Sequence, residues 1–500
     1  MNKGLLILAL SAFLICFSSH ALNVTASEAG QLERLVKDKA VTELVVTGTI
    51  DARDIQFIAE ELKELKILDL TEVKIAAYSG SSPCFGDILE YGEDVLPDYC
   101  FFDKSYETVK LPASLKCIGK GAFAGCVMLT EVVFPVAPDS IGDYAFAACT
   151  SLEYISLPRN VGKIGKGCFS RCSSLRMIDL TSLSSACAMG DYMFSNCNSL
   201  ESVVLSDAMT VIPSGMFAGC SVLSTVLIGE NPILESIGEN AFASTGLTSF
   251  PFGSCSKLKT IGYWAFAGTP LNEVNLPTGV ESLGEGAFFG NTELNVIDLS
   301  QSNIEELSDF MLTGANSING SIGIGETVSR IGRYAFSGAG MAGISLPAAL
   351  TYIGDRAFEY NATLAGISIN AKSVPELGDE VFYGMNQSAV TLKVPQKSLL
   401  LYQSAEQWKE FNIVGDMSDI EETLGYGDDI KVYFADRMLI VKASEIIKHI
   451  EMCEPGGVLL VSSNPYSKSV SVDTAEMAGR LYVVSVRLES GRAKTLKLIR

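Results

Sequence analysis

Histidine is almost missing from this chain, whose 500 residues include only His20 and His449. Serine–histidine triads, imidazole proton shuttles and multi-histidine metal sites all need imidazole groups beside the reacting atoms. His20 lies in a segment that we expect to be removed, which would leave His449 alone near the carboxyl end. The scarcity of histidine therefore excludes these chemistries from most of the chain.

Positive charge is also scarce. The chain has 37 Lys and Arg against 58 Asp and Glu, a net charge of −21, and the removal of Lys3 with the first segment would make it −22. Nucleic-acid binding relies on clustered Lys and Arg that neutralise phosphates. We therefore expect no nucleic-acid partner and interpret the acidity as a solubility feature.

Long apolar runs are absent except at the amino end. There, Lys3 is followed by an apolar run from Leu5 to Phe17 and then by Ser19-His20-Ala21, the small-x-small pattern of a cleavage site. No later stretch has the roughly 18 continuous apolar residues of a transmembrane helix. We predict a signal peptide over residues 1–21 and an exported protein, secreted or on the outer cell surface, with no transmembrane segment.

The chain is instead rich in one repeated pattern, Ile-Gly-x-x-Ala-Phe-x-x-Cys-x-x-Leu-x-x-Ile-x-Leu-Pro, seen at residues 141–158. Its copies are 22 to 26 residues apart, inside the range of leucine-rich repeats. The pattern predicts a repeat solenoid of about 13 units over residues 96–395, with short parallel strands joined by turns or helical corners. We place the motif phenylalanine at residues 101, 123, 146, 169, 194, 217, 242, 266, 288, 310, 336, 358 and 382.

The segments before and after the array lack the repeated pattern. A solenoid needs terminal caps, because an end repeat has no neighbour on one side. Residues 22–95 are predicted to form an α/β cap and entry loop, with helices over 27–36 and 51–64, strands over 42–47 and 65–71, and a loop over 79–98. The remaining segments are predicted as a carboxy-terminal cap (396–415), a linker (416–429) and an all-β sandwich (430–500).

Cysteines follow the repeat. Five of them lie three residues after the motif phenylalanine, and the same slot later holds Thr245, Thr269, Asn291, Thr313 and Asn361. A slot that accepts Cys, Thr or Asn favours a small side chain that bonds backbone at a turn, so we predict a ladder of buried free thiols. Scattered disulfides and a metal site stay open as alternatives. The five are Cys126, Cys149, Cys172, Cys197 and Cys220.

On these motifs, residues 96–395 resemble the BspA-like family of bacterial leucine-rich repeat surface proteins. The resemblance implies adhesion to host extracellular-matrix proteins or other cells and contact with host receptors. The segment from Gly456 to Arg500 resembles the carboxy-terminal sorting domain of type IX secretion, which would carry the array across an outer membrane. A plain β-sandwich accessory domain is the alternative for this segment.

Positions between the inward residues of each predicted strand face outward and carry any specificity. In the early repeats they gather an apolar stripe, a candidate surface for a protein partner. The alternative is that the loop over 79–98 covers some of them or that they only favour the strand conformation. The candidate binding residues are Val133, Tyr154, Met177, Val204 and Leu227.

Two other functions, an enzyme and a structural protein, are alternatives to a binding module. A carboxylate-based glycan hydrolase needs only two acidic side chains, and a structural envelope protein needs no site at all. His449 and Cys453 are four residues apart, but two residues make no metal site and their surroundings suggest a strand. We predict a protein without enzymatic activity, cofactor or metal.

Overall fold

The computed structural model describes residues 20–80, 85, 90–134, 138–416, 430–435, 438–454, 459–474 and 481–499. The chain divides into two compact units, residues 1–416 and 417–500, which are described separately. Most of the predicted signal peptide and nearly all of the predicted linker lie outside the described residues. No helix within the described ranges is long and apolar enough to cross a membrane.

The first unit begins with three long parallel strands, β1 (Ala21–Ala26), β2 (Glu43–Ile50) and β3 (Ile67–Ile75), and two helices, α1 (Leu32–Leu35) and α2 (Ala52–Glu61). Asp51 caps α2, because its carboxylate accepts a bond from the Arg53 N–H while Asp54 bonds back to the Asp51 N–H. Both helices are shorter than predicted. Strand β1 was not predicted, since its first residue, Ala21, falls in the expected signal peptide.

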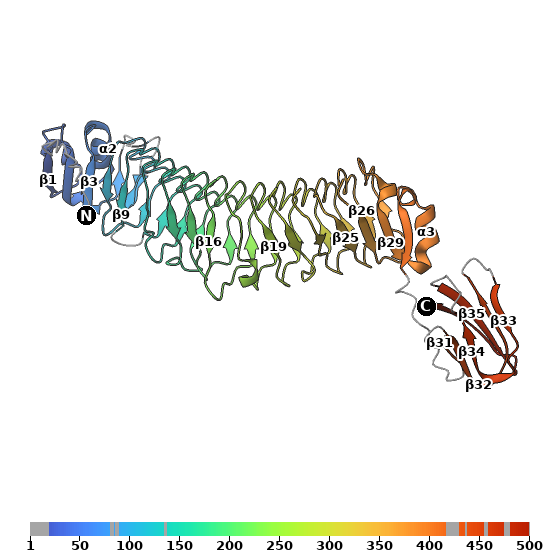
Figure 1. Cartoon of the computed structure of the whole chain (residues 1–500). Coiled ribbons are helices and arrows are strands. Elements are labelled where there is room, and N and C mark those ends of the chain that lie inside the picture. Colours follow the sequence, from blue (N-terminus) through green and yellow to red (C-terminus); the bar gives the residue numbers. More distant parts are fainter. Residues whose placement is uncertain are drawn as a thin grey trace, which may run out of the picture. The chain divides into compact units, whose positions relative to one another are not determined.

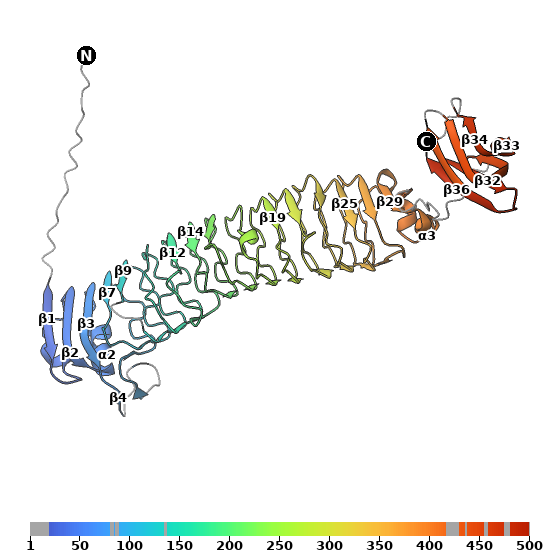
Figure 2. The same ribbon diagram turned by 90° about the horizontal axis from the view of Figure 1, so that it is seen from below.

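The Leu-x-x-Ile-x-Leu part of each repeat forms one face of the unit, which we call sheet 1. Its strands are parallel and lie along one side of the array (Figures 1 and 2), but their pairing falls into four separate groups. After β3 they are β7 (Thr108–Lys110), β9 (Glu131–Val133), β12 (Met177–Asp179), β14 (Ser202–Val204), β16 (Thr225–Leu227), β19 (Glu273–Asn275), β21 (Val296–Asp298), β23 (Ser321–Ile322), β25 (Gly343–Leu346), β27 (Gly366–Ile369), β29 (Thr391–Pro395) and β30 (Asn412–Asp416). This parallel-strand solenoid confirms the predicted fold class.

The first residue of the Ile-Gly pair and the residue before it form the two-residue strands of a second face, sheet 2. They are β6 (Val95–Leu96), β8 (Cys117–Ile118), β10 (Ser140–Ile141), β11 (Lys163–Ile164), β13 (Ala188–Met189), β15 (Val211–Ile212), β17 (Ser236–Ile237), β18 (Thr260–Ile261), β20 (Ser282–Leu283), β22 (Glu306–Leu307), β24 (Arg330–Ile331), β26 (Tyr352–Ile353) and β28 (Glu376–Leu377). Their pairing is interrupted between β13 and β15 and between β20 and β22.

Glycine follows most sheet 2 strands because neighbouring repeats come very close there. A Cβ atom on Gly142 would lie 2.7 Å from the carbonyl carbon of Gly119, and one on Gly190 would lie 2.4 Å from the Lys166 backbone nitrogen. The glycine N–H closes the ladder, as in the 2.8 Å bond from Gly190 to the Ile164 carbonyl. We call this position the glycine slot.

The corner that follows the glycine slot alternates aromatic residues with glycine. Tyr144 has a left-handed backbone, with φ of 56°, and its ring lies against Gly167, the equivalent residue of the next repeat. A Cβ on Gly167 would lie 2.5 Å from that ring. Tyr99 covers Gly121 and Tyr192 covers Gly215 in the same way. Each of these three tyrosine rings therefore lies over a glycine, whereas farther along the array Phe310 and Tyr334 stack on each other at the same corner.

Phenylalanine rings fill the space between the two sheets. From Phe123 to Phe288 the motif rings are fully buried and stack on one another with centroids 5.2 to 5.8 Å apart. Offset aromatic pairs at such separations add stability beyond the burial of their area. The rings form the continuous core of the solenoid.

One predicted motif residue is wrong. Phe310 is outside the core, with a left-handed backbone, and stacks on Tyr334 at 5.1 Å. Leu312 takes the buried position and bonds to the Ala335 carbonyl as the motif phenylalanines do. The repeat is therefore shifted by two residues, so Ala315, rather than Thr313, occupies the cysteine slot.

Aromatic side chains close the carboxyl end of the first unit. After β29 the chain forms η3 (Gln396–Ser398), α3 (Leu399–Ser404) and η4 (Trp408–Glu410) before it adds β30 to sheet 1. Trp408 is buried against Phe382, with ring centroids 5.4 Å apart, and Phe411 contacts the same ring. The final repeat is thereby shielded from water.

The second unit is antiparallel. Its strands are β31 (Ile430–Ala435), β32 (Met438–Cys453), β33 (Leu459–Ser463), β34 (Ser467–Asp473), β35 (Leu481–Leu488) and β36 (Ala493–Ile499). The long strand β32 pairs with four of the others and carries much of the buried core, including Leu439 and Ile450. His449 lies on β32 as the alternation suggested, and its ring bonds to Asn464 and Glu451.

We predict that Phe169→Ala will lower the free energy of unfolding by about 3–5 kcal/mol, the usual cost of emptying a buried phenylalanine site. The Phe169 ring stacks on Phe146 and Phe194 at 5.5 Å each. Urea denaturation followed by circular dichroism measures the loss. Tyr263→Ala is the control, because Tyr263 is exposed and its removal should change stability by about 0.5 kcal/mol or less. A loss below about 1 kcal/mol for Phe169→Ala would contradict a stack that stabilises the array.

Candidate interaction surface

The five predicted binding residues lie on the outer side of sheet 1, but in two parallel columns. Tyr154 pairs with Met177 in the first column, which continues to Ser202 and Thr225. Val204 pairs with Leu227 in the second column, where Asp179 precedes them. The single stripe expected from the sequence is therefore a zigzag that changes column between Val133 and Tyr154 and again between Met177 and Val204.

Exposure separates the five residues into two groups. Tyr154, Met177 and Leu227 are 59%, 46% and 52% exposed, whereas Val133 and Val204 are half-buried. Side chains of adjacent parallel strands are about 4.8 Å apart, so Tyr154 and Met177 form one contiguous apolar area. Val133 belongs to the second column, beside Lys110, and is a marginal member of this surface.

The described part of the entry loop packs away from these residues. The hairpin of β4 (Tyr78–Ser79) and β5 (Glu90–Tyr91) lies beside α2, and Tyr91 contacts both Tyr78 and Phe85. Figure 2 shows β4 on the opposite side of the solenoid from strand β9. Within the described ranges, this loop does not cover Tyr154 or Met177.

Burial raises the pKa of the Asp54 carboxyl group, a shift that a general acid would also have. Its oxygens accept backbone N–H bonds from Gly30, Leu32 and Asp51, which ties it to the cap of α2. A glycan hydrolase needs a protonated carboxyl group facing a second carboxylate across an open cleft. Asp54 has a structural role instead.

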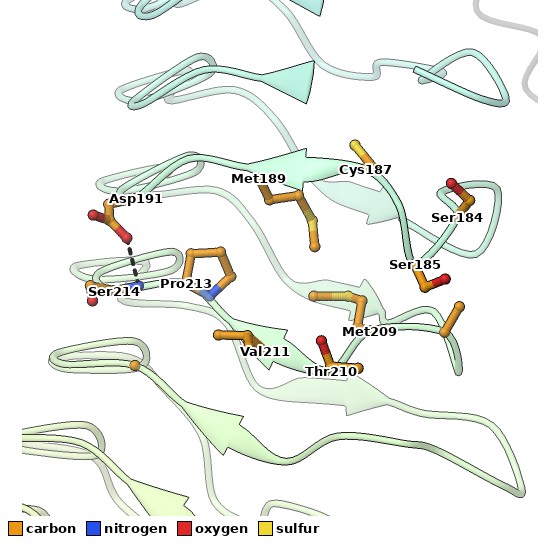
Figure 3. A pocket seen from close by; sticks show the side chains of 12 residues that line it. Ser184, Ser185, Cys187, Met189, Asp191, Met209, Thr210, Val211, Pro213 and Ser214 are labelled. Atoms are coloured by element: carbon orange, nitrogen blue, oxygen red, sulfur yellow. Dashed lines mark hydrogen bonds between the residues drawn. The ribbon is translucent and has the colours of Figure 1, made fainter. Parts of the chain in front are cut away.

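A pocket that the sequence analysis missed lies at the first interruption of sheet 2. Its volume is about 320 Å³, and it opens between β13 and β15. Figure 3 shows Met189 and Met209 facing one another, with Ser184 and Ser185 at one end and Asp191 and Ser214 at the other. The signal for it was Pro213, which stands in the glycine slot.

The family described as BspA type leucine rich repeat region matches residues 94–224, 139–269, 230–339 and 315–423. These matches together span two thirds of the chain. The chain belongs to the BspA-type leucine-rich repeat family. The predicted resemblance is thereby confirmed for the repeats. The resemblance of the tail to a sorting domain stays a prediction.

Similar solved structures include one, with a TM-score of 0.50, that shows the same fold. A leucine-rich repeat protein from Bacteroides ovatus is 23% identical, with a TM-score of 0.50, over 66% of this chain and 89% of that one. A leucine rich cell surface protein from Faecalibacterium prausnitzii is 17% identical, with a TM-score of 0.30, over 67% and 86% of the two chains. The pneumococcal vaccine antigen PcpA is 17% identical, with a TM-score of 0.24, over 71% and 69%. No curated protein matches the chain significantly.

In this BspA-type array the cysteine ladder has a structural role. Each of the five ladder thiols is buried and donates a hydrogen bond to the carbonyl of the motif phenylalanine one repeat earlier, at 3.1 to 3.2 Å. Asn291 and Asn361 make the same bond with their side-chain amides. The eleven cysteines in the described ranges are free, and no metal-binding cluster is found there. The prediction of a thiol ladder is confirmed for these residues.

We predict that the ladder thiols will resist alkylation until the protein unfolds. Burial raises the pKa of the Cys126 and Cys172 thiols to about 12, so little thiolate, the reactive form, is present at pH 8. Iodoacetamide labelling with peptide mass mapping tests this, with Cys117 and Cys453 as partly exposed controls. Labelling of Cys149 in the native protein would contradict the prediction, as would its failure to label in denaturant without reductant.

Proposed function

We propose that the protein is an exported, non-enzymatic binding module of the cell surface or extracellular space. Its scaffold is a rigid array whose core is continuous, and one outer face carries the exposed apolar area around Tyr154 and Met177. That area is the observation that carries the proposal, because exposed aromatic and methionine side chains are typical anchors of protein interfaces. The partner is a protein, of the host extracellular matrix, a host receptor or another cell.

The surroundings of Tyr154 and Met177 fit a protein partner. Ser202 and Thr225 continue the first column, and Asp179 flanks the second, so a polar rim borders the apolar centre. This arrangement of an apolar centre within a polar rim is common in interfaces that form and dissociate. The description of the Faecalibacterium relative as a cell surface protein supports the location.

We predict that Tyr154→Glu with Met177→Glu will weaken partner binding by about 30-fold or more, the effect of losing anchors worth about 2 kcal/mol. Biolayer interferometry against immobilised fibronectin, laminin and collagen measures the change. The matched control is Tyr360→Glu with Val222→Glu, since these side chains are 60% and 46% exposed outside the sheet 1 strands. Both double variants should melt within a few degrees of the parent. Undiminished binding by the first variant would rule out this surface.

The tail supports a separate proposal about location. Residues 430–500 are proposed to act as the sorting domain for export, after the predicted signal peptide has directed the chain through the inner membrane. Antibody labelling of intact cells against the repeats is expected to fall to background when residues 430–500 are deleted. Unchanged labelling would leave the tail as an accessory domain. If the repeats reach the surface but no matrix or cell partner is captured, the structural envelope function is favoured.

A further inference from the structure

The pocket between β13 and β15 is caused by Pro213, which stands in the glycine slot but cannot donate the N–H bond that glycine makes there. In ordinary repeats the glycine N–H bonds to the carbonyl of the preceding strand, as Gly165 does to Ile141 and Gly238 to Ile212, both at 2.8 Å. Proline has no N–H, and its ring carbons occupy the slot in which even a Cβ would meet backbone. The repeat that contains β15 is therefore held away from β13 on this side alone.

The interruption leaves main-chain groups free on both walls. At a regular junction the Lys163 N–H bonds to the Asp139 carbonyl, directly before strand β10. The equivalent bond here would run from Val211 to Cys187. In the described part of the chain no hydrogen bond is made by the Val211 N–H or by the Cys187 and Met189 carbonyls. One main-chain N–H group and two main-chain carbonyl groups therefore face the pocket without a hydrogen-bond partner among the described residues.

At the second interruption of sheet 2, between β20 and β22, a side chain of the protein itself bridges the gap. Ser308 stands in the glycine slot after β22, and its hydroxyl donates to the Gly284 carbonyl at 2.8 Å. Among the described residues no such bond crosses the gap at Pro213. The adjacent bonds between the two repeats run from the Ser214 N–H to the Asp191 carboxylate at 3.1 Å and from the Tyr192 N–H to the Ser214 carbonyl at 2.8 Å. The first gap is open to a ligand and the second is bridged.

The lining of the open gap restricts the ligand. Its floor is apolar, from Met189 and Met209, and its ends are polar, from Ser185, Thr210 and the Asp191 carboxylate. No Lys, Arg or His lines it, so an anionic ligand would meet Asp191 without a counter-charge. Its volume of about 320 Å³ is at the small end of ligand pockets, which suits one ring rather than a chain of them.

We propose that this pocket binds one uncharged pyranose sugar unit, free or as the terminal residue of a glycan. A pyranose has C–H surfaces that suit the methionine floor and hydroxyl groups around its rim. Those hydroxyls donate to the Asp191 carboxylate and the free carbonyls and accept from the Val211 N–H. The site is on sheet 2, so it is independent of the protein-binding surface proposed for sheet 1.

The test uses the full chain and saturation-transfer NMR with methyl glycosides of glucose, galactose, mannose, fucose and N-acetylglucosamine. Transfer to at least one glycoside is expected. Pro213→Gly should abolish it, because the new N–H bonds to the Met189 carbonyl and closes the gap. Ser308→Gly is the matched control, a change in the same slot at the bridged interruption, and should leave transfer intact. Circular dichroism confirms that both variants are folded.

A second variant keeps the proposal testable if Pro213→Gly disturbs the fold. Asp191→Asn retains an oxygen for the Ser214 N–H but removes the charge, and should weaken binding about tenfold. Immobilised glycans that end in the preferred sugar distinguish the two sources: equal binding indicates a glycan terminus, and binding of the methyl glycoside alone indicates a free sugar. The absence of transfer from every glycoside overturns the proposal, as does transfer that survives in a folded Pro213→Gly.

Discussion

Close approach of backbone to backbone at the glycine slot governs how the repeats of this solenoid stack. Where Gly142 and Gly190 meet the preceding repeat, even one additional carbon would overlap main-chain atoms. The strands of sheet 2 have only two residues each, so the contact at the slot, its N–H bond and the N–H bond at the start of each strand hold the separation on this face. Sheet 1 and the phenylalanine stack have the same spacing but are held by their own contacts.

This constraint explains why Ser308 and Pro213, the two non-glycine residues in the slot inside the array, have different results. Serine adds a carbon and an oxygen but restores one cross-repeat bond, so the array continues with a small distortion. Proline adds a ring and, within the described residues, makes no hydrogen bond to the preceding repeat. The stack is unbroken beneath Pro213, since Phe194 and Phe217 are still parallel within 7° at 5.8 Å. A gap on one face and an intact core can coexist because the two faces have separate hydrogen-bond ladders.

Much of the architecture was predictable because one motif recurs in phase. The spacing identified the solenoid, the inward residues of sheet 1 and the turn role of the cysteine slot. The shift at Phe310 was missed because an aromatic residue of the corner lies two positions from the core slot, and only burial distinguishes Phe310 from Leu312. The residues of the proposed protein-binding surface lie on the outer side of sheet 1, as the alternation of each strand predicted, but their two columns depend on the pairing register. The pocket was not predicted, because its one sequence signal is the N–H bond that Pro213 cannot make.

The alternation of tyrosine and glycine at the corner decides which changes in repeat number preserve the contacts there. Tyr99, Tyr144 and Tyr192 each lie over the glycine of the next repeat, and each has a left-handed backbone that such a side chain rarely adopts. Removing one repeat here would put two rings side by side, as Phe310 and Tyr334 already are farther along, or two glycines. Over this stretch only a step of two repeats, about 45 residues, preserves the fit of ring on glycine.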